Sequence, residues 1–246
     1  MSVIGRRPLL IAGVGLLAGR GAAADPKGGP WSIELFTSQG CSSCPAADLI
    51  LGKLAGRPDI VALSFHVDYW DYIGWKDRFA STESTERQRV YARTLKQRYV
   101  YTPEMVVDGI GHDTGRDKAP IEALLARAQA LSPRRATPEL ARTMGKPLTI
   151  RLDAFPLGGR TADVTLAVSD RRHTTPVKSG ENQGRMIENF NVVRRLELID
   201  HWDGAAKSWT VPGGDIGATQ GVAVLVQWSD HGAMIGCNKL EPAYSG

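Results

Sequence analysis

The chain has 246 residues, of which 42% are hydrophobic, and it carries a formal net charge of +4 at pH 7. This length and composition are typical of a soluble globular protein with one large or two small hydrophobic cores. The Lys and Arg residues form no stripe interleaved with aromatic residues, so nucleic acid is not an expected partner.

The N-terminus is expected to be an export signal. Arg6 and Arg7 precede an apolar run over residues 8–18, and three alanines follow at 22–24. This succession predicts a signal peptide over residues 1–24 and a periplasmic or secreted mature protein. The paired arginines fit twin-arginine export, and Sec export remains open. The apolar run is shorter than the roughly 20 residues that cross a bilayer, so we expect no membrane span in the mature chain.

Residues 30–131 have the pattern of an α/β domain. Alternation predicts a strand over 31–36, and apolar residues at helical spacing predict a helix that begins near Pro45. The continuous apolar run 60–67 is typical of a strand buried in a parallel sheet. The remaining elements expected in this part are a helix at 84–98, a strand at 105–107 and a helix at 121–131.

The second half of the chain has a different texture. Residues 132–147 contain three prolines and several charges and are expected to be a linker. From 148 to 246, short alternating runs separated by turns predict a smaller antiparallel β domain. Its strands are expected at 149–154, 162–168, 192–198, 221–228 and 233–237. The polar stretch 179–185 is expected to be a hairpin turn and is assigned no chemistry.

The chain has three cysteines, Cys41, Cys44 and Cys237. Cys41 and Cys44 stand at the start of the first expected helix, where free backbone N–H groups and the helix dipole favour a thiolate. We therefore expect Cys41 to attack a substrate and Cys44 to resolve the mixed disulfide. Cys237 lies in an apolar run and is expected to be a buried free thiol.

Other uses of the cysteine pair stay open. One alternative is a structural disulfide in a non-catalytic binding module. Another is a Cu(I)-binding or copper-delivery protein that holds the ion between the two thiolates, with His66 as a third ligand. Zinc needs four ligands, and the chain has no second pair of this spacing. We expect neither a resident metal nor a cofactor.

The order of these parts resembles the thioredoxin fold. A strand, the sequence Cys41-Ser42-Ser43-Cys44, a helix, and Thr102-Pro103 before another strand follow one another as they do there. In thioredoxins a cis-proline loop lies against the cysteine pair and presents backbone groups to the substrate. The resemblance therefore implies that Thr102 and Pro103 bind substrate.

Longer stretches resemble a more specific family. Residues 34–45, 66–72 and 101–109 are similar to a bacterial family of secreted thioredoxin-like proteins, known only as domain of unknown function 1223. The resemblance implies export and an α/β fold in which a thioredoxin-like domain is followed by the smaller β domain. It implies no established activity.

One departure from the thioredoxin pattern concerns the proton acceptor. Thioredoxins keep a buried acid six residues before the first cysteine, where this chain has Leu35, and the period of a strand turns Glu34 to the other face. His66 and Asp68, at the end of the second expected strand, are the candidate proton acceptors. The alternative for His66 is a core histidine with no direct role.

Aromatic residues follow directly after this strand. Tyr69, Trp70, Tyr72 and Trp75 either line a substrate groove or form the core of a folded loop. Tyr69 and Trp70 are our candidates for substrate binding. The function expected is a thiol–disulfide oxidoreductase that acts on thiols or disulfides of exported proteins and is reset by an unidentified redox partner.

Overall fold

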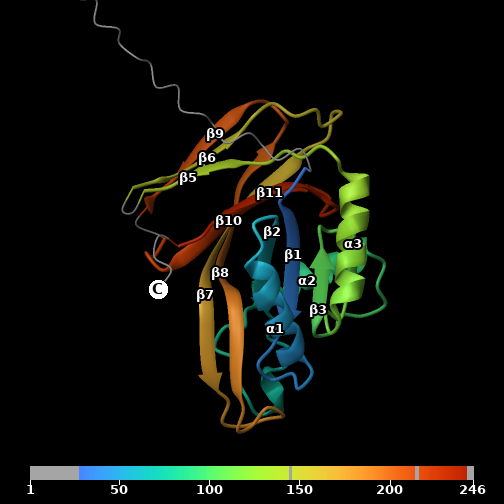
Figure 1. Cartoon of the computed structure of the whole chain (residues 1–246), viewed down its shortest axis with the longest axis vertical. Coiled ribbons are helices and arrows are strands. Elements are labelled where there is room, and N and C mark those ends of the chain that lie inside the picture. The colour runs from blue at the N-terminus through green and yellow to red at the C-terminus, as the bar shows by residue number, and fades with distance from the viewer. Residues whose placement is uncertain (1–27, 144–145, 214–215, 243–246) are drawn as a thin grey trace, which may run out of the picture.

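The computed structural model describes residues 28–143, 146–213 and 216–242 (Figure 1). The expected signal peptide, residues 1–24, lies outside the described residues. Within the described ranges, no helix is both long and apolar enough to cross a membrane.

The first half of the described chain alternates strands and helices. Its elements are β1 (Trp31–Thr37), α1 (Cys44–Ala55), β2 (Ile60–His66), the short 3-10 helix η1 (Asp71–Ile73), α2 (Thr82–Thr94), β3 (Glu104–Val107), β4 (Gly111–Asp113) and α3 (Lys118–Leu131). The helix expected at 84–98 lies earlier in the chain. It begins early because the Ser81 hydroxyl accepts a hydrogen bond from the Ser84 backbone N–H, and it ends before Lys96, whose φ of 56° is left-handed.

The second half adds strands only. They are β5 (Glu139–Ala141), β6 (Leu148–Leu152), β7 (Ala162–Pro176), β8 (Met186–Trp202), β9 (Lys207–Val211), β10 (Gln220–Trp228) and β11 (Met234–Leu240). The expected linker at 132–147 contains β5, which pairs with β6. β7 and β8 are longer than expected. They pair with each other from Ala162 and Trp202 to Pro176 and Met186, and this pairing continues through their charged residues.

Eight strands form one sheet in the order β11-β10-β7-β8-β2-β1-β3-β4. β1 is parallel to β2 and antiparallel to β3, and β4 is antiparallel to β3. β8 joins parallel to β2 where Val192 pairs with Ser64, and Asn191 Nδ2 donates a hydrogen bond of 2.9 Å to the Ala62 carbonyl. The protein is therefore a mixed α/β structure with this large sheet and a small antiparallel sheet in the order β5-β6-β9.

Helices cover both faces of β1, β2 and β3. α1 and α3 pack on one face, where Leu51 and Leu125 share a buried cluster with side chains of these strands. α2 packs on the opposite face, where Tyr91 contacts Phe36 edge to face. The small sheet covers β7, β10 and β11, and Ile150 lies in the core between them. Figure 1 shows the β7–β8 hairpin running past α1, with its turn at the same end of the molecule as the start of α1.

A buried ion pair joins the start of β1 to the C-terminal strands. Arg135 Nη1 lies 2.6 Å from Asp108 Oδ2, and both side chains are 1% exposed. The Arg135 guanidinium also stands 4.1 Å over the Trp31 ring. It donates further hydrogen bonds to the carbonyls of Pro30 and Met234. This arginine therefore contacts three segments that are distant in sequence.

Candidate functional site

The cysteine pair lies at the start of α1, as expected. Cys44 is the first residue of α1, and Pro45 occupies its first turn. Cys41 lies in the preceding turn, where its carbonyl accepts a hydrogen bond of 3.2 Å from the Cys44 backbone N–H. The two sulfurs form a disulfide, with the Cα atoms 5.4 Å apart. Cys41 is 1% exposed and Cys44 0% exposed, so the oxidised pair is covered.

A buried carboxyl group lies one helical turn after Cys44. Asp48 follows Cys44 by four residues in α1, which places both side chains on one face of the helix. Asp48 Oδ2 accepts a hydrogen bond of 3.1 Å from the Thr37 hydroxyl, and Asp48 Oδ1 has no hydrogen-bond partner among the described residues. Burial raises the pKa of Asp48 to about 7, although the charge of His66 and the Thr37 hydroxyl act in the opposite direction. A carboxyl group with this pKa takes up and releases a proton near neutral pH.

His66 ends β2 next to this carboxyl group. Its Nδ1 lies 2.6 Å from Asp77 Oδ2, and both side chains are fully buried. Burial alone would raise the pKa of Asp77, but His66 and the backbone N–H groups of Gln39 and Phe79 hold it below its ordinary value. His66 Nε2 is buried and has no hydrogen-bond partner within the part of the chain that the structure describes. His66 therefore belongs to a buried acid–base cluster with Asp48 and Asp77.

The turn between β7 and β8 contacts the cysteine loop. Asn182 is fully buried, and its Nδ2 donates hydrogen bonds of 2.9 Å to the carbonyls of Gln39 and Cys41. Glu181 Oε2 accepts a hydrogen bond of 3.2 Å from the Ser42 backbone N–H. The expected hairpin turn at 179–185 is present, but its contact with the cysteines was not predicted. Its composition carries no signal for a partner 141 residues away.

The side chain of Gln39 also connects the cysteine loop to its surroundings. Its Nε2 donates hydrogen bonds of 3.0 Å to Thr175 Oγ1 in β7 and to Asn189 Oδ1 in β8. Its Oε1 accepts a hydrogen bond of 3.2 Å from Trp75 Nε1. The loop before α1 is therefore held by the β7–β8 hairpin and by the aromatic segment together.

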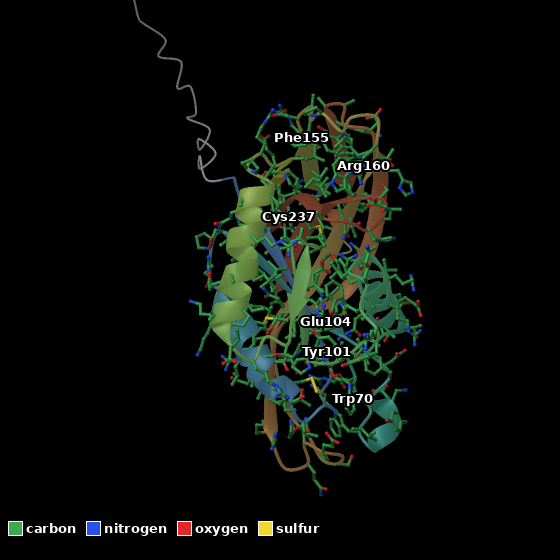
Figure 2. The ribbon with its side chains drawn as sticks, turned by 90° about the vertical axis from the view of Figure 1, so that its right-hand side faces the viewer. Trp70, Tyr101, Glu104, Phe155, Arg160 and Cys237 are labelled. Atoms are coloured by element: carbon green, nitrogen blue, oxygen red, sulfur yellow. A yellow bond between two sulfur atoms is a disulfide. The ribbon has the colours of Figure 1, made fainter. Side chains whose placement is uncertain are left out.

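The residues expected to bind substrate lie together at this end of the molecule. The Thr102–Pro103 peptide bond is cis. Trp70 Nε1 donates a hydrogen bond of 2.7 Å to Thr102 Oγ1, and a side chain at Gly40 would lie 3.4 Å from Trp70 Cβ. Tyr69 is bound through its hydroxyl to Gln88 Oε1 of α2 at 3.0 Å. Figure 2 shows Trp70 and Tyr101 at the same end of the molecule as the disulfide.

Asp68 faces a different element. Its carboxylate accepts hydrogen bonds from the hydroxyls of Thr82 and Thr85 at the start of α2. The Thr85 hydrogen bond and the Thr82 hydrogen bond hold the pKa of Asp68 below its ordinary value, against the opposing effect of burial. Of the two candidate proton acceptors, His66 therefore lies in the buried cluster near the cysteines, whereas the Asp68 carboxylate is bound to α2.

In β1, the strand before the cysteines, Glu34 and Leu35 face opposite sides of the sheet, as expected. Leu35 lies in the core beneath α1 and α3, at the position where an acid was missing. Glu34 faces α2, where it accepts hydrogen bonds from Arg87 Nη2 at 2.9 Å and from the Tyr91 hydroxyl at 2.6 Å. Glu34 is thus occupied on the face opposite α1, and Asp48 supplies a buried acid on the side of the cysteines.

Metal ligands do not gather in the described residues. Within residues 28–143, 146–213 and 216–242, no group of three or more His, Cys, Asp or Glu side chains is arranged to hold a metal ion. A histidine can bind a metal through either ring nitrogen. In His66, Nδ1 is hydrogen-bonded to Asp77.

Comparison with known proteins identifies the family. A family model described as "Protein of unknown function (DUF1223)" matches residues 32–227, which include the cysteine pair, the cis-proline and the β7–β8 hairpin. The chain belongs to the DUF1223 family. A crystal structure of protein AGR_C_4864 from Agrobacterium tumefaciens is similar to this DUF1223 chain, with 32% sequence identity and a TM-score of 0.77. The match covers 89% of this chain and 97% of that chain. No curated protein matches the sequence.

The third cysteine of this DUF1223 chain lies in a different part of the molecule (Figure 2). Cys237 in β11 is fully buried, and its Sγ donates a hydrogen bond of 3.1 Å to the Pro30 carbonyl. Burial raises the pKa of Cys237 to about 12. Because the thiolate is the reactive form, Cys237 is expected to be inert in the folded protein.

This inertness is testable by brief alkylation of the reduced, folded protein at pH 8. Peptide mapping should find the label on Cys41, and on Cys237 only after unfolding in denaturant. The same protocol on a Cys41→Ala variant controls for background labelling. Early labelling of Cys237 would contradict its assignment as a protected thiol.

Proposed function

We propose that Cys41 and Cys44 carry out thiol–disulfide exchange with other proteins. The observation that carries this proposal is the combination of a cysteine pair at the start of α1 with a buried carboxyl group, Asp48, whose pKa of about 7 suits proton transfer at neutral pH. A disulfide with a purely structural role needs no such proton acceptor beside it. Asp48 therefore favours the redox hypothesis over the structural one.

The arrangement of strands supports a thioredoxin-like unit at residues 30–131. Its four strands lie in the order β2-β1-β3-β4, with β1 parallel to β2 and antiparallel to β3. In thioredoxins the cysteine pair likewise precedes the helix after β1, and a cis-proline precedes β3. Thr102 and Pro103 are therefore proposed to present backbone groups to a substrate, beside Tyr69 and Trp70.

The proposed reaction begins from the reduced pair. The Cys41 thiolate attacks a disulfide of the substrate protein, forms a mixed disulfide and releases one substrate thiolate. Asp48 then takes the proton of the Cys44 thiol. The Cys44 thiolate attacks Cys41 Sγ, which re-forms the Cys41–Cys44 disulfide and releases the second substrate thiolate. The substrate is reduced, the pair is oxidised, and a redox partner restores the dithiol; the reverse sequence oxidises a substrate dithiol.

The buried cluster defines a role for His66. Its Nδ1 lies 2.6 Å from Asp77 Oδ2, and its charge lowers the pKa of Asp48. His66 is proposed as a positioning residue that acts through Asp48. Asp68 is not part of this step, because its hydrogen bonds go to α2.

The proposed compartment is the periplasm or the exterior of the cell. This part of the proposal depends on the signal-like pattern of residues 1–24 and on the stability of disulfides in oxidising compartments. Its partners would be thiols or disulfides of exported proteins.

A Cys44→Ala variant tests the exchange reaction. Isolated from an oxidising compartment, it should carry mixed disulfides through Cys41, because the thiol that resolves them is missing. Non-reducing and reducing gels would show adducts that disappear on reduction. A Cys41→Ala variant is the matched control and should carry none. Absence of adducts on Cys44→Ala, together with tight Cu(I) binding by the reduced unmodified protein, would favour the copper alternative instead.

A further inference from the structure

The turn of the β7–β8 hairpin places a carboxylate on the backbone of the loop that carries the two cysteines. Glu181 Oε2 accepts a hydrogen bond of 3.2 Å from the backbone N–H of Ser42, the residue that follows Cys41. This N–H lies one residue before Ser43, the N-cap of α1, and therefore next to the free N–H groups of the helix start that favour a thiolate. Glu181 therefore brings a negative charge to the backbone of the residue next to Cys41.

The position of Glu181 is fixed by its neighbours. Asn182 is fully buried and is bound to the carbonyls of Gln39 and Cys41 at 2.9 Å. Ser179 Oγ donates a hydrogen bond to the Gly74 carbonyl on the other side of the turn. A side chain at Gly180 would lie 3.2 Å from Trp75 Cβ, so the turn packs closely on the aromatic segment. These contacts hold the carboxylate at the cysteine loop.

The charge of Glu181 opposes the helix start. A negative charge near Cys41 disfavours a second negative charge on its sulfur, while the N–H groups and dipole of α1 favour it. Other charged or titratable groups near the cysteine loop include Asp48 from α1, His66 from β2, Asp77 from the segment before α2, and Arg185 from the hairpin, which is bound to Asn182 Oδ1. Among the described contacts, Glu181 provides the carboxylate bound to the backbone between the cysteines.

We propose that Glu181 is a positioning residue that opposes thiolate formation on Cys41 and thereby makes the Cys41–Cys44 disulfide harder to reduce. This role rests on the redox chemistry proposed above and deepens it, because it assigns a direction. Destabilising the thiolate shifts the equilibrium from the dithiol toward the disulfide, so the reduced pair donates electrons more readily. The hairpin, which lies outside the residues 30–131, thus biases the pair toward reducing its substrates.

A Glu181→Gln variant of the full chain removes the charge and keeps a hydrogen-bond acceptor. In the reduced protein, the rate of Cys41 alkylation by iodoacetamide is measured against pH. The midpoint should fall by roughly half a pH unit, which is about a threefold rise in thiolate below the midpoint. In glutathione redox buffers, the equilibrium should shift toward the dithiol by a similar factor of about three. Both shifts should shrink in high salt, because Glu181 is exposed.

Two further variants make the test decisive. Glu83→Gln removes the same charge from an exposed position in the first turn of α2 and should leave both midpoints unchanged. Glu181→Lys reverses the charge and should move both midpoints in the same direction as Glu181→Gln, by roughly one pH unit for alkylation. Unchanged midpoints in both Glu181 variants, or equal shifts in Glu83→Gln, would overturn the proposal.

The outcome is independent of the trapping experiment. If Cys44→Ala carries no adducts but Glu181→Gln shifts both midpoints, Glu181 tunes the pair and the exchange function is wrong. If Cys44→Ala carries adducts and the midpoints do not move, the exchange function stands and the role of Glu181 is wrong.

Discussion

Replacement of Asp48 with asparagine is expected to slow thiol–disulfide exchange about a hundredfold at pH 7, which is the lower range for loss of a general base. Asparagine keeps the shape of the side chain but cannot take the proton of Cys44. The rate to measure is reduction of a model protein disulfide by the pre-reduced variant under single-turnover conditions. Mixed disulfides should also persist longer than in the unmodified protein.

The same substitution is expected to stabilise the fold at neutral and alkaline pH. The pKa of Asp48 rises from 3.8 to about 7 on folding, so the folded state holds the proton more tightly than the unfolded state. The stability that this proton contributes is complete below pH 4 and is lost as the pH rises toward 7. Above that range, ionised Asp48 costs roughly 4 kcal/mol, from about three pH units at 1.36 kcal/mol each. The Asp48→Asn variant should lose this pH dependence.

Denaturant unfolding at pH 4 and pH 8 measures the effect. Asp48→Asn should match the unmodified protein at pH 4 and exceed it at pH 8. Asp68→Asn is the matched control, because the pKa of Asp68 is lowered by its hydrogen bonds and this carboxylate stabilises the fold when ionised. Asp68→Asn should therefore be less stable at pH 8 and should exchange at the normal rate. If thiol–disulfide exchange were slow in Asp68→Asn and normal in Asp48→Asn, Asp68 and not Asp48 would be the proton acceptor.

Replacement of Arg135 with methionine is expected to lower the free energy of unfolding by about 3 to 5 kcal/mol. The substitution leaves the buried Asp108 carboxylate without the guanidinium that faces it at 2.6 Å, and an unpaired buried charge is costly. It also removes the hydrogen bonds to Pro30 and Met234. Loss of these contacts should loosen the junction between β1 and the C-terminal strands.

Thermal and denaturant unfolding would measure this loss. Arg116→Met removes an exposed arginine and should change the free energy of unfolding by less than about 0.5 kcal/mol. An Arg135→Met, Asp108→Asn double variant should recover part of the loss, because asparagine leaves no charge unpaired, tolerates the φ of 49° at this position and keeps an acceptor for the Ser32 N–H. Equal stability of Arg135→Met and Arg116→Met would show that the buried pair contributes little.

Local patterns in the sequence predicted the elements that carry the cysteines. Alternation found β1, the apolar run found β2, and the position of Pro45 found the start of α1. These predictions succeeded because each depends on residues close together in the chain. The burial of Cys237 followed from an apolar run for the same reason.

Contacts between distant segments could not be predicted in this way. The parallel pairing of β8 with β2 depends on neighbours more than a hundred residues apart, and the polar turn that holds Glu181 and Asn182 reads as an ordinary hairpin. Asp48 did leave a local signal. It lies four residues after Cys44 and three before Leu51, on the buried face of α1, where an acid is costly unless it has a partner or stays protonated.

The hairpin and the cysteine loop are far apart in sequence, which affects when their contacts form during folding. The loop reaches its partners across 141 residues at Asn182 and 150 residues at Asn189. Contacts of such separation close large loops and form slowly, because the chain must give up more entropy to make them. The cysteines are three residues apart and need none of these contacts to react with each other. We therefore expect the disulfide to form in a newly made chain before the last third of the chain covers it, while the pair can still react with other thiols.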